Sequence, residues 1–288
     1  MKEIMKAASK VPKNADQKVV DGFGDEWARF DQRDLEDSEL QAAFDGYFKI
    51  FPWEKIGATA EGFDMGCGSG RWAKLVAPRV GKLNCIDPSE RALSIARENL
   101  SGHANCSFFC YSVDETALSQ SSQDFGYCLG VLHHIPDSLS GLKSCVRILK
   151  PGAPLLVYLY YAFENRPLWF KLIWKVTDPA RRIVSRLPYK IRYALSQLIA
   201  ALIYWPLART SRVAESIGLN VSNFPLSYYR HRSFYTMRTD ALDRFGTRLE
   251  KRFTKDQIFT MMSESGLESI NFSDTPPFWC AIGYRKTI

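Results

Sequence analysis

The chain has 288 residues, of which 46% are hydrophobic, and a formal net charge of +7 at neutral pH. This length allows one large domain or a domain with a sizeable insertion, and the apolar content is that of a globular protein with a proper core. Seven cysteines without paired metal-ligand spacing argue against a metal site or a disulfide framework, and they predict reduced thiols in a cytoplasmic protein.

The apolar stretches predict neither a signal peptide nor a membrane span. Residues 1–18 are polar and lysine-rich, without an apolar run. The most apolar stretch, residues 195–208, is shorter than the roughly 20 residues that a spanning helix needs. We therefore expect a soluble protein without a transmembrane segment.

The positive charge is concentrated in one part of the chain. Residues 162–252 hold 17 Lys and Arg against 6 Asp and Glu, whereas the remainder carries a net charge of −4. This asymmetry predicts an anionic partner near that segment, although solvated helix faces would give the same pattern.

The N-terminal 50 residues are predicted to form a helical cap, helical from about Gly24. Its aromatic side chains either cover a ligand pocket or simply pack against the fold: Trp27, Phe30, Phe44, Tyr47 and Phe48. From about residue 60 to 160, strands alternate with helical patterns, which is typical of a parallel sheet with crossover helices. We expect strands over 63–65, 82–86, 107–113, 124–131 and 155–160, and helices over 71–80, 89–100 and 139–149.

The alternation stops at about residue 161 and resumes near residue 250. The intervening segment, residues 161–250, is rich in proline, arginine, tyrosine and tryptophan, and it predicts only short helices. A capping box, Thr254 with Gln257, then starts a helix. Two closing strands over 267–272 and 278–284 are joined by a short link, which favours an antiparallel pair. The expected core is therefore 51–160 with 251–288, and the insertion is a substrate-binding cap.

A glycine-rich loop follows the first expected strand. It reads Asp64, Gly66, Gly68 and Gly70, and Asp87 ends the next strand. Glycine lets the backbone approach a ligand closely, and an acid at a strand end can bind ribose hydroxyls. Arg71 occupies the position where a dinucleotide-binding loop has glycine. The pattern indicates an adenosine-containing cofactor.

At these residues the chain resembles the class I S-adenosylmethionine-dependent methyltransferases. The resemblance extends to residues 130–137 after the fourth strand and to residues 149–152 before the fifth. It implies a Rossmann-like α/β fold with a seven-stranded, mostly parallel sheet and an antiparallel last strand. It also implies S-adenosylmethionine as cofactor and S-adenosylhomocysteine as product.

The resemblance assigns cofactor-binding roles residue by residue. Asp64 is expected near the cofactor ammonium, Asp87 on the ribose and Pro88 beside the adenine. The full expected set is Asp64, Gly66, Cys67, Gly68, Gly70, Asp87, Pro88, Val113, Asp114 and Gly130. After the third strand the family usually has an acidic residue at the adenine edge. In this chain that residue is either Asp114 or is replaced by Ser112. Asp114 could equally serve only to form a turn or to cap a helix. Cys67 is expected to fill space rather than to act as a nucleophile.

His133 and His134 are the candidate catalytic bases, because they follow the fourth strand at the carboxyl edge of the sheet. Methyl transfer needs a base only where the acceptor must lose a proton. One or both histidines could instead pack or cap the next helix. No third metal ligand is evident, so no metal is expected.

The insertion supplies the candidate acceptor site. The residues expected to bind substrate are Tyr160, Tyr161, Arg166, Tyr229, Arg230, Arg232, Tyr235 and Arg238. We expect Arg166, Arg230, Arg232 or Arg238 to anchor an acidic group. Salt bridges that tie the insertion to the core are the alternative for each arginine.

The leading prediction is a methyltransferase of a small, anionic metabolite. A second candidate is a methyltransferase of a lipid- or quinone-like acceptor at a membrane surface, because Trp169, Trp174 and the run from Ile191 to Leu207 could lie on a bilayer. A helical cap burying its apolar face on the sheet fits the same pattern. A nucleic-acid methyltransferase and a cofactor-binding protein without transfer activity are also compatible with the motifs, although no nucleic-acid-binding module is evident.

Overall fold

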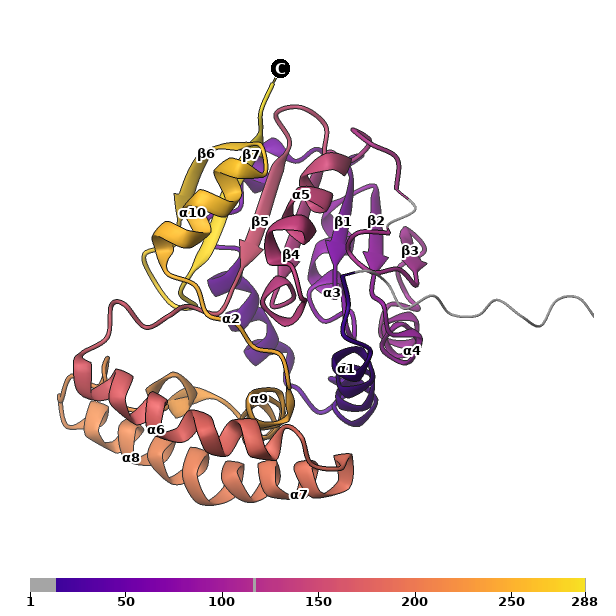
Figure 1. Ribbon diagram of the computed structural model, residues 1–288. Coiled ribbons are helices and arrows are strands. Elements are labelled where there is room, and N and C mark those ends of the chain that lie inside the picture. The colour runs from indigo at the N-terminus through magenta and orange to yellow at the C-terminus, as the bar shows by residue number, and fades with distance from the viewer. Residues whose placement is uncertain (1–13, 116–117, 288) are drawn as a thin grey trace, which may run out of the picture.

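The computed structural model describes residues 14–115 and 118–287, and it shows an α/β domain with a layer of helices facing one end of its sheet (Figure 1). Residues 1–13, which carry much of the prediction of no signal peptide and begin the predicted N-terminal cap, lie outside the described residues. The strands are β1 (Glu61–Met65), β2 (Lys82–Ile86), β3 (Cys106–Phe109), β4 (Phe125–Leu129), β5 (Pro154–Tyr158), β6 (Leu267–Phe272) and β7 (Cys280–Arg285). The α-helices are α1 (Gln17–Arg29), α2 (Asp37–Tyr47), α3 (Ala73–Val76), α4 (Glu90–Asn99), α5 (Ser138–Ile148), α6 (Leu168–Val184), α7 (Tyr189–Ile199), α8 (Trp205–Ser216), α9 (Phe234–Gly246) and α10 (Lys255–Glu264).

The strands form one sheet in the order β3-β2-β1-β4-β5-β7-β6. All neighbours pair in parallel except β7, which is antiparallel to both β5 and β6. The predicted fold class is confirmed. The strand order reverses at β1, so the loops after β1 and β4 flank the crevice where ligands of such sheets bind.

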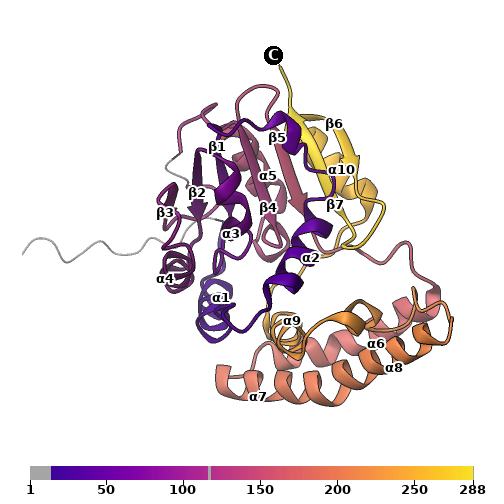
Figure 2. The same ribbon diagram turned by 180° about the vertical axis from the view of Figure 1, so that it is seen from behind.

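Both faces of the sheet are buried, which accounts for the apolar strands. One core cluster includes Trp72, Leu93 and Tyr127 and lies under α2, α3 and α4, whereas the other includes Leu142 and Met262 and lies under α5 and α10 (Figures 1 and 2). Capping fixes the helix starts as the sequence predicts. Ser89 caps α4, and the capping box at Thr254 begins α10.

The first crossover helix is shorter than predicted. The expected helix over 71–80 is an α-helix only from Ala73 to Val76, followed by a 3₁₀ turn, Ala77–Arg79. Pro78 lies in that turn. Because proline lacks a backbone N–H and crowds the preceding turn, it ends the regular helix here.

The prediction of only short helices in the insertion is wrong. Helix α6 has 17 residues, and α7, a π-helical turn and α8 run on as one helix of 28 residues, Tyr189–Ser216. Of the described residues, this helix alone is long and apolar enough to cross a membrane. Pro179 lies within α6, and Pro206 lies in the first turn of α8, so neither proline ends its helix.

The insertion forms the separate helical layer seen opposite the carboxyl ends of the strands (Figures 1 and 2). Helix α9 lies between the rest of this layer and the α/β domain, with contacts to α1 on one side and to α6 and α7 on the other. The layer thus faces the crevice of the sheet across α9.

Candidate active site

One cavity of about 1360 Å³ lies between the carboxyl edge of the sheet and the insertion. Its wall is built from α1, the loops after β1, β2, β3, β4 and β5, and the segment from α8 to α9. Small-molecule sites usually measure about 300–1,000 Å³. The cavity is therefore large enough for a nucleoside cofactor together with an acceptor.

The glycine loop packs tightly between two other parts of the chain. Gly66, Gly68 and Gly70 have φ values of +77°, +54° and +77°, in the left-handed region that glycine tolerates. A Cβ on Gly66 would lie 2.2 Å from a methyl carbon of Val131, and one on Gly68 would lie 2.8 Å from the indole nitrogen of Trp27. Gly66 lines the cavity, whereas Cys67, Gly68 and Gly70 lie behind the wall.

Asp87 joins this loop to the end of β2. Its Oδ2 accepts a hydrogen bond from the Gly68 amide at 3.0 Å, and its Oδ1 accepts one from the Ser89 amide at 2.9 Å. Burial raises the pKa of Asp87 to about 6, although these two amides counteract the rise. A carboxylate has about four acceptor positions, so Asp87, which lines the cavity beside Pro88, can still accept two ribose hydroxyls.

Ser112 and Val113, which follow β3 where adenine is expected, both lie on the cavity wall. Asp114 is not on the wall, and its Oδ1 accepts a hydrogen bond from the Ser112 hydroxyl at 2.7 Å. This position corrects the expectation that Asp114 contacts adenine. Gly130 has φ of +83°, and a Cβ there would meet no atom within 4 Å, so this part of the wall faces open space. The residues present fit an adenosine group.

Asp64 and Cys67 lie beneath the loop rather than in the cavity. Asp64 is 1% exposed, and burial raises its pKa to about 8, partly offset by Tyr127. A hydrogen bond with Cys85 lowers the pKa of Cys67, but burial and nearby carboxylates raise it to about 11. The structure thus does not place Asp64 at a cofactor ammonium, and the Cys67 thiol is a buried filler of the loop.

Arg71 is a wall residue that the sequence analysis did not select. Its guanidinium lies 4.4 Å from the ring centre of Trp72 and 5.7 Å from that of Trp27. Within the described residues it makes no ion pair. A guanidinium held on aromatic faces and open to the cavity can bind a carboxylate through two parallel hydrogen bonds, and S-adenosylmethionine carries one such group. The sequence feature that could have identified Arg71 as a site residue is its position directly after Gly70 of the glycine loop.

The structure separates the roles of the two histidines. His133 is fully buried and is absent from the cavity wall, and its Nδ1 accepts a hydrogen bond from the Tyr160 amide at 3.3 Å. Burial lowers the pKa of His133 well below its ordinary value. This contradicts the expectation that His133 is a catalytic base, because no acceptor can reach it.

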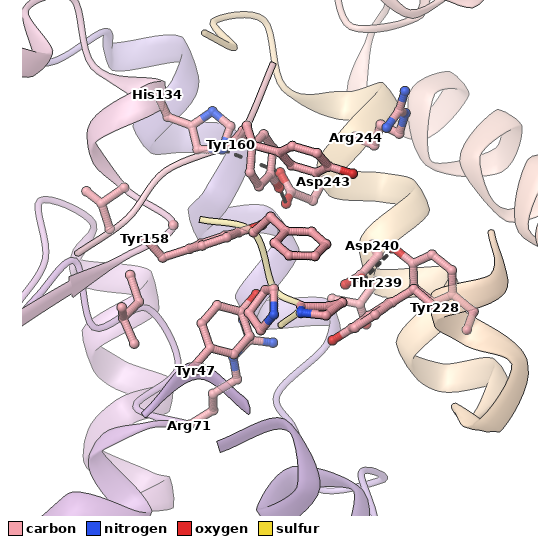
Figure 3. Close-up of a pocket in the computed structure, with 18 of the residues that line it drawn as sticks. Tyr47, Arg71, His134, Tyr158, Tyr160, Tyr228, Thr239, Asp240, Asp243 and Arg244 are labelled. Carbon is pink, nitrogen blue, oxygen red and sulfur yellow. Dashed lines mark hydrogen bonds and ion pairs between the residues drawn. The ribbon is translucent and has the colours of Figure 1, made fainter. Parts of the chain in front are cut away.

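His134 lies on the cavity wall (Figure 3). Its Nδ1 is 2.7 Å from the carbonyl oxygen of Leu249, so Nδ1 carries the hydrogen and donates it. The other ring nitrogen, Nε2, lies 3.8 Å from Oδ1 of Asp243. With the hydrogen on Nδ1, the lone pair of Nε2 can accept a proton, and a carboxylate lies beside it.

Two carboxylates of α9 bind tyrosine hydroxyls across the cavity (Figure 3). Tyr160 donates to Oδ2 of Asp243, and Tyr229 donates to Oδ2 of Asp240 at 2.8 Å. Burial raises the pKa of Glu26 well above its ordinary value, and the nearby Asp243 and Asp240 raise it further. Burial also raises the pKa of Asp240, to about 6. Both carboxylates therefore bind tyrosines that lie outside α9.

The four arginines expected to anchor an acidic group all have partners within the protein. Arg230 pairs with both oxygens of Glu215, at 2.8 and 2.9 Å. Arg232 donates to the Glu39 carbonyl at 3.1 Å, which ties the insertion to α2. Arg166 donates to the Tyr161 hydroxyl, and Arg238 donates to the Tyr193 hydroxyl, both at 3.0 Å.

The cavity wall therefore contains only some of the predicted substrate residues. Tyr160, Tyr161, Arg166, Tyr229, Arg230 and Arg232 line it, whereas Tyr235 and Arg238 do not. The Tyr235 hydroxyl instead accepts a hydrogen bond from the Gln32 amide at 2.9 Å. The arginine partners favour the interpretation in which these side chains hold the insertion in place.

Comparison with known proteins agrees with this site. Residues 63–152 match the family model described as a methyltransferase domain. The chain is 35% identical over 183 residues to the ubiquinone biosynthesis O-methyltransferase of Alkalilimnicola ehrlichii, covering 58% of this chain and 72% of that protein. It is 34% identical over 171 residues to the protein of that name from Hahella chejuensis, covering 54% and 72%.

The overlap with other such relatives is smaller. The aligned part spans 66% of the Bordetella avium protein, at 27% identity over 56% of this chain, and 51% of the Idiomarina loihiensis protein, at 31% identity over 38% of this chain. Among solved structures, a chain of the Haloferax volcanii complex of a methyltransferase with its activator Trm112 has a TM-score of 0.54 at 16% identity. That match covers 94% of this chain and 98% of the other, and it shows a shared fold.

The chain belongs to the class I S-adenosylmethionine-dependent methyltransferases. Its cofactor is S-adenosylmethionine, and it is an enzyme of methyl transfer.

The raised pKa of Asp87 predicts that cofactor affinity depends on pH. The carboxylate is lost as the pH falls through about 6, and only the carboxylate accepts both ribose hydroxyls. We expect the Kd for S-adenosylhomocysteine, measured by calorimetry, to rise about tenfold between pH 7.5 and pH 5. Asp87→Asn should bind weakly with little dependence on pH, and an unchanged slope in this variant would assign the titration to another group.

The open guanidinium of Arg71 predicts a contact with the cofactor carboxylate. Arg71→Met should weaken S-adenosylhomocysteine binding about ten- to hundredfold, as for a lost hydrogen bond to a charged group. Methylthioadenosine, which has no carboxylate, should bind both proteins equally well. Arg97→Met, which removes an exposed arginine on α4, is the control, and equal losses for both nucleosides would contradict the assignment.

Proposed function

We propose that this methyltransferase transfers its methyl group to a phenolic hydroxyl of an aromatic, quinone-like acceptor. The observation that carries the proposal is His134, a wall residue whose tautomer is fixed by the Leu249 carbonyl and whose Nε2 adjoins Asp243. Such a base is needed for a hydroxyl acceptor, which must lose its proton as it is methylated. The relatives named as ubiquinone biosynthesis O-methyltransferases support the same class of acceptor.

The character of the wall supports an aromatic acceptor. Tyrosine and phenylalanine side chains surround the cavity, among them Tyr47, Tyr158, Tyr160, Tyr228 and Phe278. Aromatic rings stack with one another in offset or edge-to-face arrangements, so such a wall favours a planar ring.

The charges near His134 favour a neutral acceptor over the anionic metabolite of the leading sequence prediction. Glu26, Asp240 and Asp243 all line the cavity there, and the pKa values of Glu26 and Asp240 are raised because burial disfavours their charge. A second anion at this position would be repelled and would lose its hydration. A neutral phenol avoids both costs.

The chain's residues can be given roles in the reaction. When bound, S-adenosylmethionine supplies an electrophilic methyl group on its sulfonium sulfur. The wall must hold the acceptor oxygen about 3–3.5 Å from that methyl and in line with the carbon–sulfur bond. Nε2 of His134 would take the proton of the acceptor hydroxyl as its oxygen is methylated. The Asp243 carboxylate stabilises the imidazolium that results.

The arginine partners bear on the class of acceptor, and the state of the cysteines bears on the cellular setting. Three arginines of the insertion that line the cavity, Arg166, Arg230 and Arg232, are bound within the fold, which weakens the case for a nucleic-acid acceptor at this site. All seven cysteines are free thiols, which supports a cytoplasmic setting.

Removing the base should slow the chemical step without affecting the cofactor. His134→Ala is expected to lower kcat at least about a hundredfold, since a positioned base contributes roughly 10²- to 10⁴-fold. Its Kd for S-adenosylhomocysteine should stay within about twofold of the parent. His133→Ala is the matched control, and it should lower the melting temperature more than kcat. Equal turnover in the parent and His134→Ala would contradict the proposed base.

The class of acceptor is testable by product formation. S-adenosylhomocysteine should accumulate with catechol or hydroquinone probes, and faster when the ring carries an isoprenoid tail, because the cavity is large. Small carboxylic acids without a phenol should give no turnover above the background. Turnover with such acids alone would favour the anionic metabolite instead.

A further inference from the structure

The long helix Tyr189–Ser216 places its apolar side chains outward. Its buried positions repeat every three or four residues and carry small or polar side chains together with one tyrosine: Arg192, Ser196, Ala200, Tyr204, Ala208 and Ser211. The opposite side carries large apolar side chains that are 47–72% exposed, namely Ile191, Leu198, Leu202, Ile203, Trp205 and Val213. A surface helix of a water-soluble protein normally has the reverse arrangement.

Helix α6 shows the same inversion. Its buried residues are Asp178 and Arg181, which form an ion pair at 2.8 Å. Arg181 also donates to the Thr247 carbonyl behind α9. Its exposed side carries Leu168, Trp169, Leu172, Ile173, Val176 and Ile183. The expectation that the insertion buries its apolar face on the sheet is therefore wrong, because that face points away from the protein.

Exposed apolar side chains are concentrated on this surface, which we call the outer face. Of the 18 large hydrophobic side chains exposed in the described residues, 14 lie between Leu168 and Leu219. Single exposed hydrophobics are ordinary, but so many on two adjacent segments mark an interaction surface. The outer face belongs to the helices of the layer that lies opposite the sheet in Figures 1 and 2.

The charge of the outer face is of one sign. Exposed basic residues accompany the apolar stripe, including Lys175, Arg182, Arg186 and Lys190. Only two carboxylates lie on the helices α6 to α8. Asp178 is buried in its ion pairs, and Glu215 is bound by Arg230 and His231. The outer face thus presents apolar and cationic groups without a free anion.

We propose that the outer face docks the enzyme on the surface of an anionic lipid bilayer, with α6 and the long helix lying in the interface plane. Helices with an apolar face flanked by Lys and Arg bind such interfaces by burying apolar area and attracting anionic headgroups. The long helix reaches the length of a span, and an 18-residue window within it has a mean hydropathy of 1.2. However, its polar and small stripe, from Arg192 to Ser211, packs on the protein, which holds the helix parallel to the surface.

A second copy of the chain fits the outer face less well. A twofold interface brings the same patch of both subunits together, so it would oppose the basic residues of one copy to those of the other. An anionic bilayer neutralises these charges and covers the apolar stripe at the same time. Charge therefore selects the bilayer over self-association.

The outer face also adjoins the cavity. Phe170 and Tyr204 come from the same two helical segments and line the cavity wall. Docking would bring the cavity within a helix diameter of the bilayer, where a tailed acceptor is dissolved. This consequence rests on the proposed function, whereas the docking itself depends only on the outer face.

The experiment is co-sedimentation of the full chain with extruded vesicles of phosphatidylcholine, with or without 30% phosphatidylglycerol. We expect binding to the anionic vesicles, weakened by 0.5 M NaCl, and little binding to the neutral ones. Leu202→Glu should abolish binding, whereas Phe259→Glu, at an exposed position of α10, should not. Lys175→Gln with Lys190→Gln should lower the partition coefficient about twentyfold, and Lys143→Gln with Lys286→Gln should leave it unchanged.

Sedimentation velocity without vesicles tests the competing occupant. If the parent chain forms a dimer that Leu202→Glu disrupts, and no vesicles bind, the outer face is a subunit interface and the proposal is overturned. Equal vesicle binding by Leu202→Glu and the parent overturns it as well. Turnover of a soluble, tail-less phenol should be the same in Leu202→Glu and the parent, so failure of docking and failure of the proposed function are distinguishable.

Discussion

The contact on which the site depends is that of Asp243 with the ends of the two central strands. From α9 it accepts the hydroxyl of Tyr160, just after β5, and lies 3.8 Å from Nε2 of His134, just after β4. Together with the hydrogen bond from Nδ1 of His134 to the Leu249 carbonyl, it anchors the insertion to the carboxyl edge of the sheet. One carboxylate thus fixes the insertion to the core and supplies the negative charge beside the candidate base.

Placing several acidic side chains beside one cavity is electrostatically unfavourable, and the positive charge of Arg71 partly compensates for it. Burial of Glu26 and Asp240 beside one cavity disfavours their ionised forms, as their raised pKa values show. Arg71 lowers both of these pKa values from across the cavity without pairing directly with either group. The cavity wall thus places the Arg71 guanidinium opposite the acidic side chains of α1 and α9.

The parts that the sequence predicted are those whose signals are local. The alternation of strands and helices predicts the parallel sheet, Thr254 and Gln257 predict the start of α10, and the spacing of the glycines predicts the loop after β1. His133 and His134 are neighbours with the same side chain, so the sequence does not distinguish them. The path of the backbone buries His133 and places His134 on the cavity wall. The partners of Arg230 and Arg232, Glu215 and the Glu39 carbonyl, are 15 and 193 residues away, so spacing could not reveal them.

The prediction for the insertion is wrong because its helices break the usual rule of burial. A sequence pattern gives the period of the apolar residues but not the direction in which they point, and the default assumption turns them toward a core. Here the small and polar stripe, from Arg192 to Ser211, is the one that packs, because α9 already covers the carboxyl edge and offers polar partners such as the Gly246 carbonyl to Arg192. A layer held to its protein by arginine, serine and alanine leaves its leucines free, and a bilayer is a medium in which that arrangement gains free energy rather than losing it.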